Sequence, residues 1–119
     1  MILIVDDEQN ICNILARFLK KEGYETEIAK IGLDAVTIFK EKKPSLVLLD
    51  INLPDIDGIE VLRKIKEIDK GVPVIMITAC MDSERVALTF RLGACDCIYK
   101  PFDFDYLKVT IKSLLGNRR

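Results

Sequence analysis

The segment that decides the fold is LVLLDINLPDIDG, residues 46–58. It begins with four consecutive apolar residues, Leu46 to Leu49. Such a run predicts a strand at 46–49 that is covered on both faces and lies centrally in a sheet. Asp50 ends this strand, and the proline, aspartates and glycine that follow predict a loop. The apolar spacing of residues 59–68 then predicts a helix, so the segment reads as one strand-loop-helix unit of an α/β fold.

The same unit recurs along the whole chain. Further strands are predicted at 2–5, 25–29, 74–77 and 97–99, and further helices at 9–22, 33–42, 83–92 and 104–115. The first helix carries an apolar stripe that includes Ile14, and the second is expected to point Leu33 inward. Asp82 and Asp103 are candidate N-caps of the last two helices.

Five such units in a row predict a single-domain, doubly wound (βα)5 fold, with a parallel five-stranded sheet and helices on both faces. From the pattern alone two strand orders remain open, the flavodoxin-like order 2-1-3-4-5 and a Rossmann-like order. The more polar strand at 25–29 is expected near an edge. In either order, ligands bind beyond the carboxyl ends of the strands, where the winding reverses.

Length and composition exclude several classes of protein. The chain has 119 residues, 50% hydrophobic and 31% charged, with a net charge of −1. These values predict one soluble globular domain over residues 1–119, whose last four residues read as either a terminus or the start of a linker. The sequence has no stripe of basic residues of the kind that predicts nucleic-acid contact. It also has no apolar run long enough to span a membrane. The short apolar run at 2–5 is no signal peptide, so a cytoplasmic location is the default expectation.

Four cysteines and no histidine narrow the chemistry further. The spacing of Cys12, Cys80, Cys95 and Cys97 is not that of a paired CxxC zinc site. We interpret them as small, partly buried residues, with a redox or metal role as the alternative. The missing histidine removes the usual general base. It also means that any phosphohistidine donor must be another molecule.

Polar side chains gather where the predicted strands end. Asp6 and Asp7 follow the first strand, Asp50 the third, Thr78 the fourth and Lys100 the fifth. Taken alone, each has an ordinary structural explanation: a helix cap, a turn residue, a hydroxyl that satisfies the backbone, or a solvated charge. Because the carboxyl ends of parallel strands meet at one edge of a sheet, we expect the five to lie together. The joint pattern therefore favours a functional site.

The charges of this set constrain its chemistry. Two carboxylates about 4 Å apart repel by roughly 4 kcal/mol at an effective dielectric near 20, so a cation or the lysine must compensate. Oxygen ligands without histidine select a hard divalent ion, best Mg²⁺. Acids, Mg²⁺, a lysine and a hydroxyl together suit a phosphoryl group. Asp50 is the candidate nucleophile because it ends the central strand.

Four motifs together resemble the receiver domain of two-component response regulators. They are the acid pair at 6–7, LLDINLPDIDG at 48–58, ITA at 77–79 and KPF at 100–102, and the resemblance covers essentially the whole chain. Because a receiver protein has the order 2-1-3-4-5, the resemblance selects that order. It implies a phosphoacceptor that assists its own phosphorylation and dephosphorylation, rather than a turnover enzyme.

The resemblance also implies roles for the acidic residues. Asp50 would accept the phosphoryl group from a histidine kinase or a histidine phosphotransfer protein. Asp7 and Asp50 would bind Mg²⁺ directly, and Asp6 through water. Asn52 would give its backbone carbonyl to the metal.

The remaining motif residues would handle the phosphoryl group itself. Lys100 would pair with its oxygens, and Thr78 would move in to donate a hydrogen bond, with the Ala79 backbone amide close by. The bond between Lys100 and Pro101 would be cis. These roles are carried over position by position from the family motifs.

One position departs from the family pattern. Three residues before the lysine the family usually has Tyr or Phe, the aromatic partner of the threonine movement, and here that residue is Cys97. Tyr99 is expected to share a strand face with Cys97, and we hypothesise that it partly replaces the aromatic residue or that the coupling is weaker. The resemblance implies that phosphorylation rearranges the face formed by residues 83–92, 97–99 and 104–115, which is also a candidate homodimer surface.

Two other readings compete with this one. A small Mg²⁺-dependent phosphatase with an aspartate nucleophile usually has a second acid two residues on, where this chain has Asn52. A pseudo-receiver would bind partners without accepting phosphate, and the complete set of acids, threonine and lysine argues against it. Steady hydrolysis of a phosphate ester would support the phosphatase reading. Absence of Mg²⁺ binding would support the pseudo-receiver reading.

Overall fold

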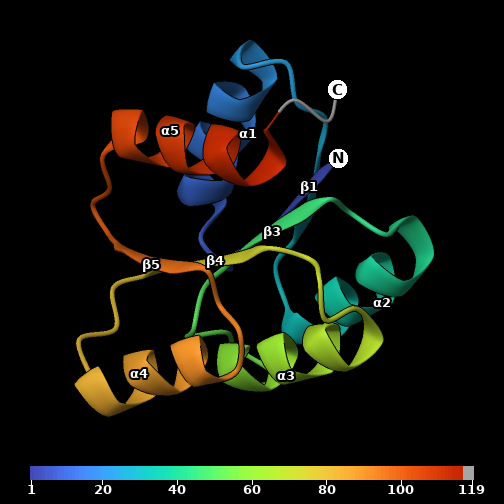
Figure 1. The fold of residues 1–119 in the computed structure, drawn as a ribbon, viewed down its shortest axis with the longest axis vertical. Coiled ribbons are helices and arrows are strands. Elements are labelled where there is room, and N and C mark those ends of the chain that lie inside the picture. Colours follow the sequence, from blue (N-terminus) through green and yellow to red (C-terminus); the bar gives the residue numbers. More distant parts are fainter. Residues whose placement is uncertain (117–119) are drawn as a thin grey trace.

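The computed structural model describes residues 1–116 and shows five strands alternating with five helices (Figure 1). The elements are β1 (Ile2–Val5), α1 (Gln9–Lys21), β2 (Thr26–Ala29), α2 (Gly32–Lys42), β3 (Leu46–Leu49), α3 (Gly58–Ile68), β4 (Val74–Thr78), α4 (Ser83–Arg91), β5 (Asp96–Tyr99) and α5 (Phe104–Leu115). Every predicted element is present, with ends that differ by at most one residue. The expectation of a domain over residues 1–119 extends to 117–119, which lie outside the described residues.

The sheet is parallel throughout and has the order β2-β1-β3-β4-β5. This is the flavodoxin-like order, and the Rossmann-like alternative is excluded. The apolar strand β3 lies at the centre, as predicted, and the more polar β2 lies at an edge. The winding reverses between β1 and β3, so the carboxyl ends of these two strands open the ligand-binding crevice.

Helices cover both faces of the sheet and separate two apolar clusters. Helices α1 and α5 pack on one face, around the side chains of Ile4, Leu48 and Ile77. Helices α2, α3 and α4 pack on the other, where Leu3 and Leu49 point. Each fully buried leucine or isoleucine contributes roughly 1.5–3 kcal/mol relative to an exposed one. The five-stranded core therefore provides a rigid frame for the loops at its carboxyl edge.

Two predictions about inward-facing residues were wrong. Ile14 is 44% exposed and Leu33 is 55% exposed. In α2 the buried positions are Gly32, Ala35 and Phe39, and Leu33 lies about 100–160° away from each of them around the helix. Ile14 borders a surface groove between α1 and α5 instead of the core.

Aspartate carboxylates accept backbone N–H bonds at the start of four helices. Asp57, Asp82 and Asp103 are N-caps whose carboxylates accept backbone N–H bonds from α3, α4 and α5, which confirms the two predicted caps. Asp55 acts from a distance, because it lies in the loop after β3 and accepts hydrogen bonds from Gly32 N at 2.7 Å and Leu33 N at 3.0 Å. The β3–α3 loop is thereby tied to the start of α2. None of the helices within residues 1–116 combines the length and apolarity needed to cross a membrane.

Candidate functional site

Three carboxylates meet at the carboxyl edge of β1 and β3. Val5 pairs with Leu49 in the sheet register, so the residues that follow each strand emerge side by side. Asp6, Asp7 and Asp50 each offer a carboxylate oxygen, and these oxygens all lie within 4.8 Å of one another. Asp6 and Asp50 are buried, whereas Asp7 is exposed. The predicted convergence of these acids is therefore present in the structure.

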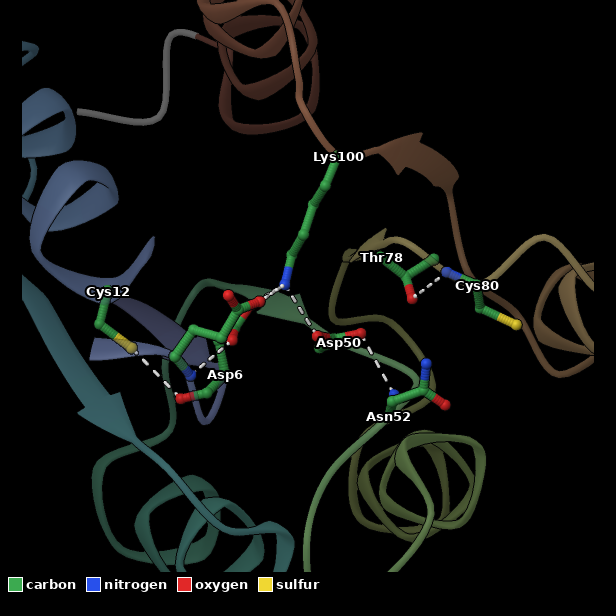
Figure 2. A network of polar contacts seen from close by, with 8 residues as sticks. Asp6, Cys12, Asp50, Asn52, Thr78, Cys80 and Lys100 are labelled. Carbon is green, nitrogen blue, oxygen red and sulfur yellow. Dashed lines mark hydrogen bonds and ion pairs between the residues drawn. The ribbon is translucent and has the colours of Figure 1, made fainter. Parts of the chain in front are cut away.

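Lys100 follows the carboxyl end of β5 and extends its side chain to the acids. Its Nζ lies 2.7 Å from Asp6 Oδ2, 2.9 Å from Asp50 Oδ2 and 3.0 Å from Glu8 Oε1 (Figure 2). Burial opposes the ammonium charge, but the bonds to Asp6, Asp50 and Glu8 outweigh it and raise the pKa of Lys100. The lysine therefore stays protonated and balances part of the negative charge. The Lys100–Pro101 peptide bond is cis, as expected.

The charge of the pocket is not fully balanced by this lysine. Burial raises the pKa of Asp6, although Lys100 and the Glu8 backbone N–H, which donates to Asp6 Oδ1 at 2.9 Å, act in the opposite direction. An acid whose ionised form is disfavoured in this way gains from a further cation nearby. The oxygen-only ligand set fits a hard divalent ion.

Thr78 ends β4 on the opposite side of Asp50 from Asp6 (Figure 2). It is fully buried, and its hydroxyl oxygen accepts a hydrogen bond from Cys80 N at 3.0 Å. The next residue, Ala79, is exposed at the rim. The described structure therefore holds the threonine by its own turn, beside the acidic pocket.

Asn52 contacts the pocket through its backbone. Its N–H donates to Asp50 Oδ1 at 3.2 Å, while its amide side chain lies beyond Asp50, away from Lys100 (Figure 2). The loop is tight because Gly58 approaches the backbone of residues 50–51, with its N–H donating to Ile51 O at 2.7 Å. The Asp50 carboxylate is therefore oriented by the Asn52 N–H at Oδ1 and by Lys100 at Oδ2.

The two candidate switch residues on β5 differ in burial. Cys97 is half-buried and packs against the cluster that α2, α3 and α4 cover, and burial raises the pKa of its thiol. Tyr99 is 43% exposed. Its role as a substitute for the usual aromatic residue stays a prediction.

The structure brings two further residues to this site. Sequence reasoning grouped Glu8 with the strand-end acids without giving it a role, and it did not identify Arg85. Glu8 is the third acid around Lys100, and its place in the run of acids at 6–8 was a usable signal. Arg85 of α4 contacts Asn52 and Asp57 across the loop after β3. No motif or spacing in the sequence pointed to Arg85.

The four cysteines are all free in the described structure, with Cys12 and Cys80 buried. Within residues 1–116, the cluster that could hold a metal ion consists of aspartates alone. Cys95 is exposed and Cys97 is half-buried, and the interpretation of the four as small, partly buried residues stays a prediction.

The chain matches known proteins over nearly all of its length. A family model described as the response regulator receiver domain matches residues 2–112. The chain is 41% identical to sporulation initiation phosphotransferase F of Bacillus subtilis over 114 residues, which is 96% of this chain and 92% of that protein. It is 38% identical to regulatory protein AtoC of Escherichia coli, where it covers 96% of this chain but 25% of the relative.

Solved structures agree with these sequence matches. The receiver domain of NtrX from Brucella abortus superposes with a TM-score of 0.91 at 36% identity, covering 98% of this chain and 99% of that one. The chain spans about a quarter to a half of the length of the DNA-binding and transcriptional relatives it matches. It therefore belongs to the response regulator receiver domain family, whose members are phosphoacceptors in two-component signalling.

Proposed function

We propose that Asp50 is the residue of this receiver domain that accepts the phosphoryl group. The observation that carries the proposal is the position of Lys100, whose ammonium bridges Asp6 and Asp50 from β5 at 2.7 and 2.9 Å. Asp50 lies at the centre of this arrangement, with one carboxylate oxygen bonded to Lys100 and the other to Asn52 N. Neither Asp6 nor Asp7 ends the central strand.

The proposal includes a Mg²⁺ ion held by this edge of the sheet. Asp7 and Asp50 would hold the ion by their carboxylates, Asn52 would offer its backbone carbonyl, and Asp6 would hold the ion through water. The proximity of oxygens from the three aspartates, within 4.8 Å of one another, supports the carboxylate part of this ligand set. When bound, the ion offsets negative charge that develops on the transferring phosphoryl oxygens.

The chain's own residues then perform the transfer. A carboxylate oxygen of Asp50 attacks phosphorus, the bond from phosphorus to the donor breaks, and the donor leaves with that electron pair. Lys100 pairs with the phosphoryl oxygens, and Thr78 and the Ala79 N–H donate to them. Because phosphorylation adds about −1.5 to −2 charges, the contacts of Lys100 and Thr78 must change. The same groups support hydrolysis of the acyl phosphate by water.

The partner in this proposal is a histidine kinase or a histidine phosphotransfer protein in the cytoplasm. These 119 residues contain no histidine, so the phosphohistidine lies outside this domain. The relative from B. subtilis is named as a phosphotransferase, which supports a place in a phosphorelay. The domain itself contacts no nucleic acid or membrane in this proposal.

Phosphorylation is read out on the face formed by α4, β5 and α5. Thr78 moves toward the phosphoryl group, and Tyr99, 43% exposed on β5, follows it in place of the family aromatic residue. The same face is a candidate homodimer surface. Tyr99→Ala should weaken phosphorylation-dependent partner binding, and unchanged binding would remove this role.

The test is intact-mass spectrometry after incubation with acetyl phosphate and Mg²⁺. The wild type should gain a single acid-labile phosphoryl group, and Asp50→Asn should gain none while it remains folded. Asp34→Asn, which changes an exposed aspartate in the first turn of α2, is the matched control and should label like the wild type. Full labelling of Asp50→Asn would contradict the proposal, and steady release of phosphate from an ester would favour a phosphatase instead.

A further inference from the structure

Arg85 connects helix α4 to the loop that carries the candidate metal carbonyl. It lies in the first turn of α4, where its backbone N–H donates to the Asp82 cap at 3.4 Å. Its side chain leaves the helix, with Nη1 donating to Asn52 Oδ1 at 3.2 Å and Nη2 paired with Asp57 Oδ2. A guanidinium has a planar fork of donors that can hold two acceptors in fixed positions.

Both acceptors belong to the segment that positions Asp50. Asn52 N–H donates to Asp50 Oδ1 at 3.2 Å, and Asp57 Oδ1 accepts the Ile59 N–H at 2.9 Å as the N-cap of α3. A series of polar contacts therefore runs from the Asp50 carboxylate through Asn52 to Arg85. It reaches α4 by a route that does not involve Thr78.

Of the two segments that Arg85 joins, helix α4 has the fewer other attachments. Helix α4 buries Val86 and Thr89, whereas the loop at 52–57 is also tied to the start of α2 through Asp55. Segments with few buried contacts open locally at low free energy. The contact of Arg85 with the better-anchored loop therefore restricts α4, and it adds a further anchor at the Asn52 end of the loop.

We infer that Arg85 is a positioning residue that fixes the β3–α3 loop against α4 and thereby couples cation binding at Asp50 to the position of α4. The inference rests on the proposed function, because it takes the Asn52 carbonyl as a metal ligand. A fixed loop presents this carbonyl without further ordering on binding. By linkage, an ion that favours the fixed loop also favours the position of α4 that Arg85 holds.

The test measures Mg²⁺ affinity by isothermal titration calorimetry. Arg85→Ala should weaken Mg²⁺ binding about two- to tenfold, the size expected when a net hydrogen bond is lost. Arg85→Lys keeps the charge but offers a point donor in place of a fork, so it should restore only part of the affinity. Arg91→Ala, at the opposite end of the same helix, is the matched control and should bind like the wild type.

A double-mutant cycle identifies the route. Asn52→Ala keeps the backbone carbonyl and removes the side chain that Arg85 holds. The effects of Arg85→Ala and Asn52→Ala should be clearly less than additive, because both remove the same contact. In the wild type, Mg²⁺ should also shift the NMR signals of the Arg85 and Val86 amides, and this shift should be largely lost in Arg85→Ala.

The outcomes separate this inference from the proposed function. A wild type that binds no Mg²⁺ contradicts the proposed metal site itself. A wild type that binds Mg²⁺, with equal affinity in Arg85→Ala or with additive effects in the cycle, overturns the role of Arg85 alone. Full rescue by Arg85→Lys would replace the positioning role with a simple charge effect and would also overturn it.

Discussion

Helices α3 and α4 lie side by side on one face of the sheet, yet they are attached very differently. Helix α3 buries five of its 11 residues, whereas α4 buries two of its nine. The first follows Asp50 through a tight loop, and the second follows Thr78. Local stability depends on buried contacts, so the acceptor half of the site is rigid and the threonine half is the part able to respond.

The largest effect is expected where the acceptor loop is tightest. A Cβ at Gly58 would lie 2.1 Å from Asp50 O and 2.7 Å from Ile51 Cα, so Gly58→Ala forces the backbone apart and should cost more than about 3 kcal/mol of unfolding free energy. Gly71→Ala has 3.5 Å to its nearest neighbour and should change stability by less than about 0.5 kcal/mol. Urea denaturation measures both, and a mild Gly58→Ala would contradict the rigid acceptor loop.

A pair of leucines compares the two helices directly. Leu62 of α3 is fully buried, so Leu62→Ala should cost about 2–5 kcal/mol. Leu88 of α4 is half-buried against the same cluster, and Leu88→Ala should cost less than about 2 kcal/mol. Equal losses in urea denaturation would mean that α4 is held as firmly as α3.

The pH dependence of metal binding tests the charge state of the acceptor half. Because burial raises the pKa of Asp6 above its usual 3.8, this acid takes up a proton sooner than an exposed aspartate as the pH falls. Mg²⁺ affinity should therefore be constant at higher pH. As the pH is lowered, the affinity should begin to decrease while the pH is still above 3.8, by up to about tenfold per pH unit, since a proton and the ion compete. Calorimetric titration across this range provides the measurement, and Asp6→Asn should move the onset of the decline to lower pH.

The smallest effect is expected when a single acid is neutralised in each half of the site, where the two changes in unfolding free energy should have opposite signs. Asp7→Asn relieves repulsion between exposed and buried acids, so it should raise the metal-free unfolding free energy by about 0.5–1 kcal/mol. Glu84→Gln removes an acid from the first turn of α4 and should lower it by about 0.3–1 kcal/mol, since acids there favour the helix dipole. Opposite signs are expected in thermal unfolding without Mg²⁺, and a destabilising Asp7→Asn would mean that the pocket charge is already balanced.

The sequence predicted the parts of the structure that follow from strand ends. Asp6, Asp50, Thr78 and Lys100 meet because parallel strands share one carboxyl edge, and that rule needs no knowledge of helix packing. The strand order could not be predicted from the hydrophobic pattern alone, because two orders satisfied that pattern. The receiver motifs selected the order that the structure shows.

The sequence did not predict which helix positions are buried or which surface side chains contact each other. The apolar stripe placed Ile14 and Leu33 inward, because residue spacing defines a helix face but not which part of it meets the sheet. Asp55 and Arg85 act on segments 22 to 33 residues away. Side-chain contacts of this length depend on how the helices pack, which no local pattern encodes.

The central claim is that the phosphoryl group is carried by Asp50. The most direct measurement treats the protein labelled by acetyl phosphate and Mg²⁺ with borohydride, which reduces an aspartyl phosphate to homoserine, and sequences the peptides by mass spectrometry. Our account predicts homoserine at position 50 and at no other aspartate. Homoserine at Asp6, Asp7 or Asp57, or an unmodified Asp50 in fully labelled protein, would contradict it.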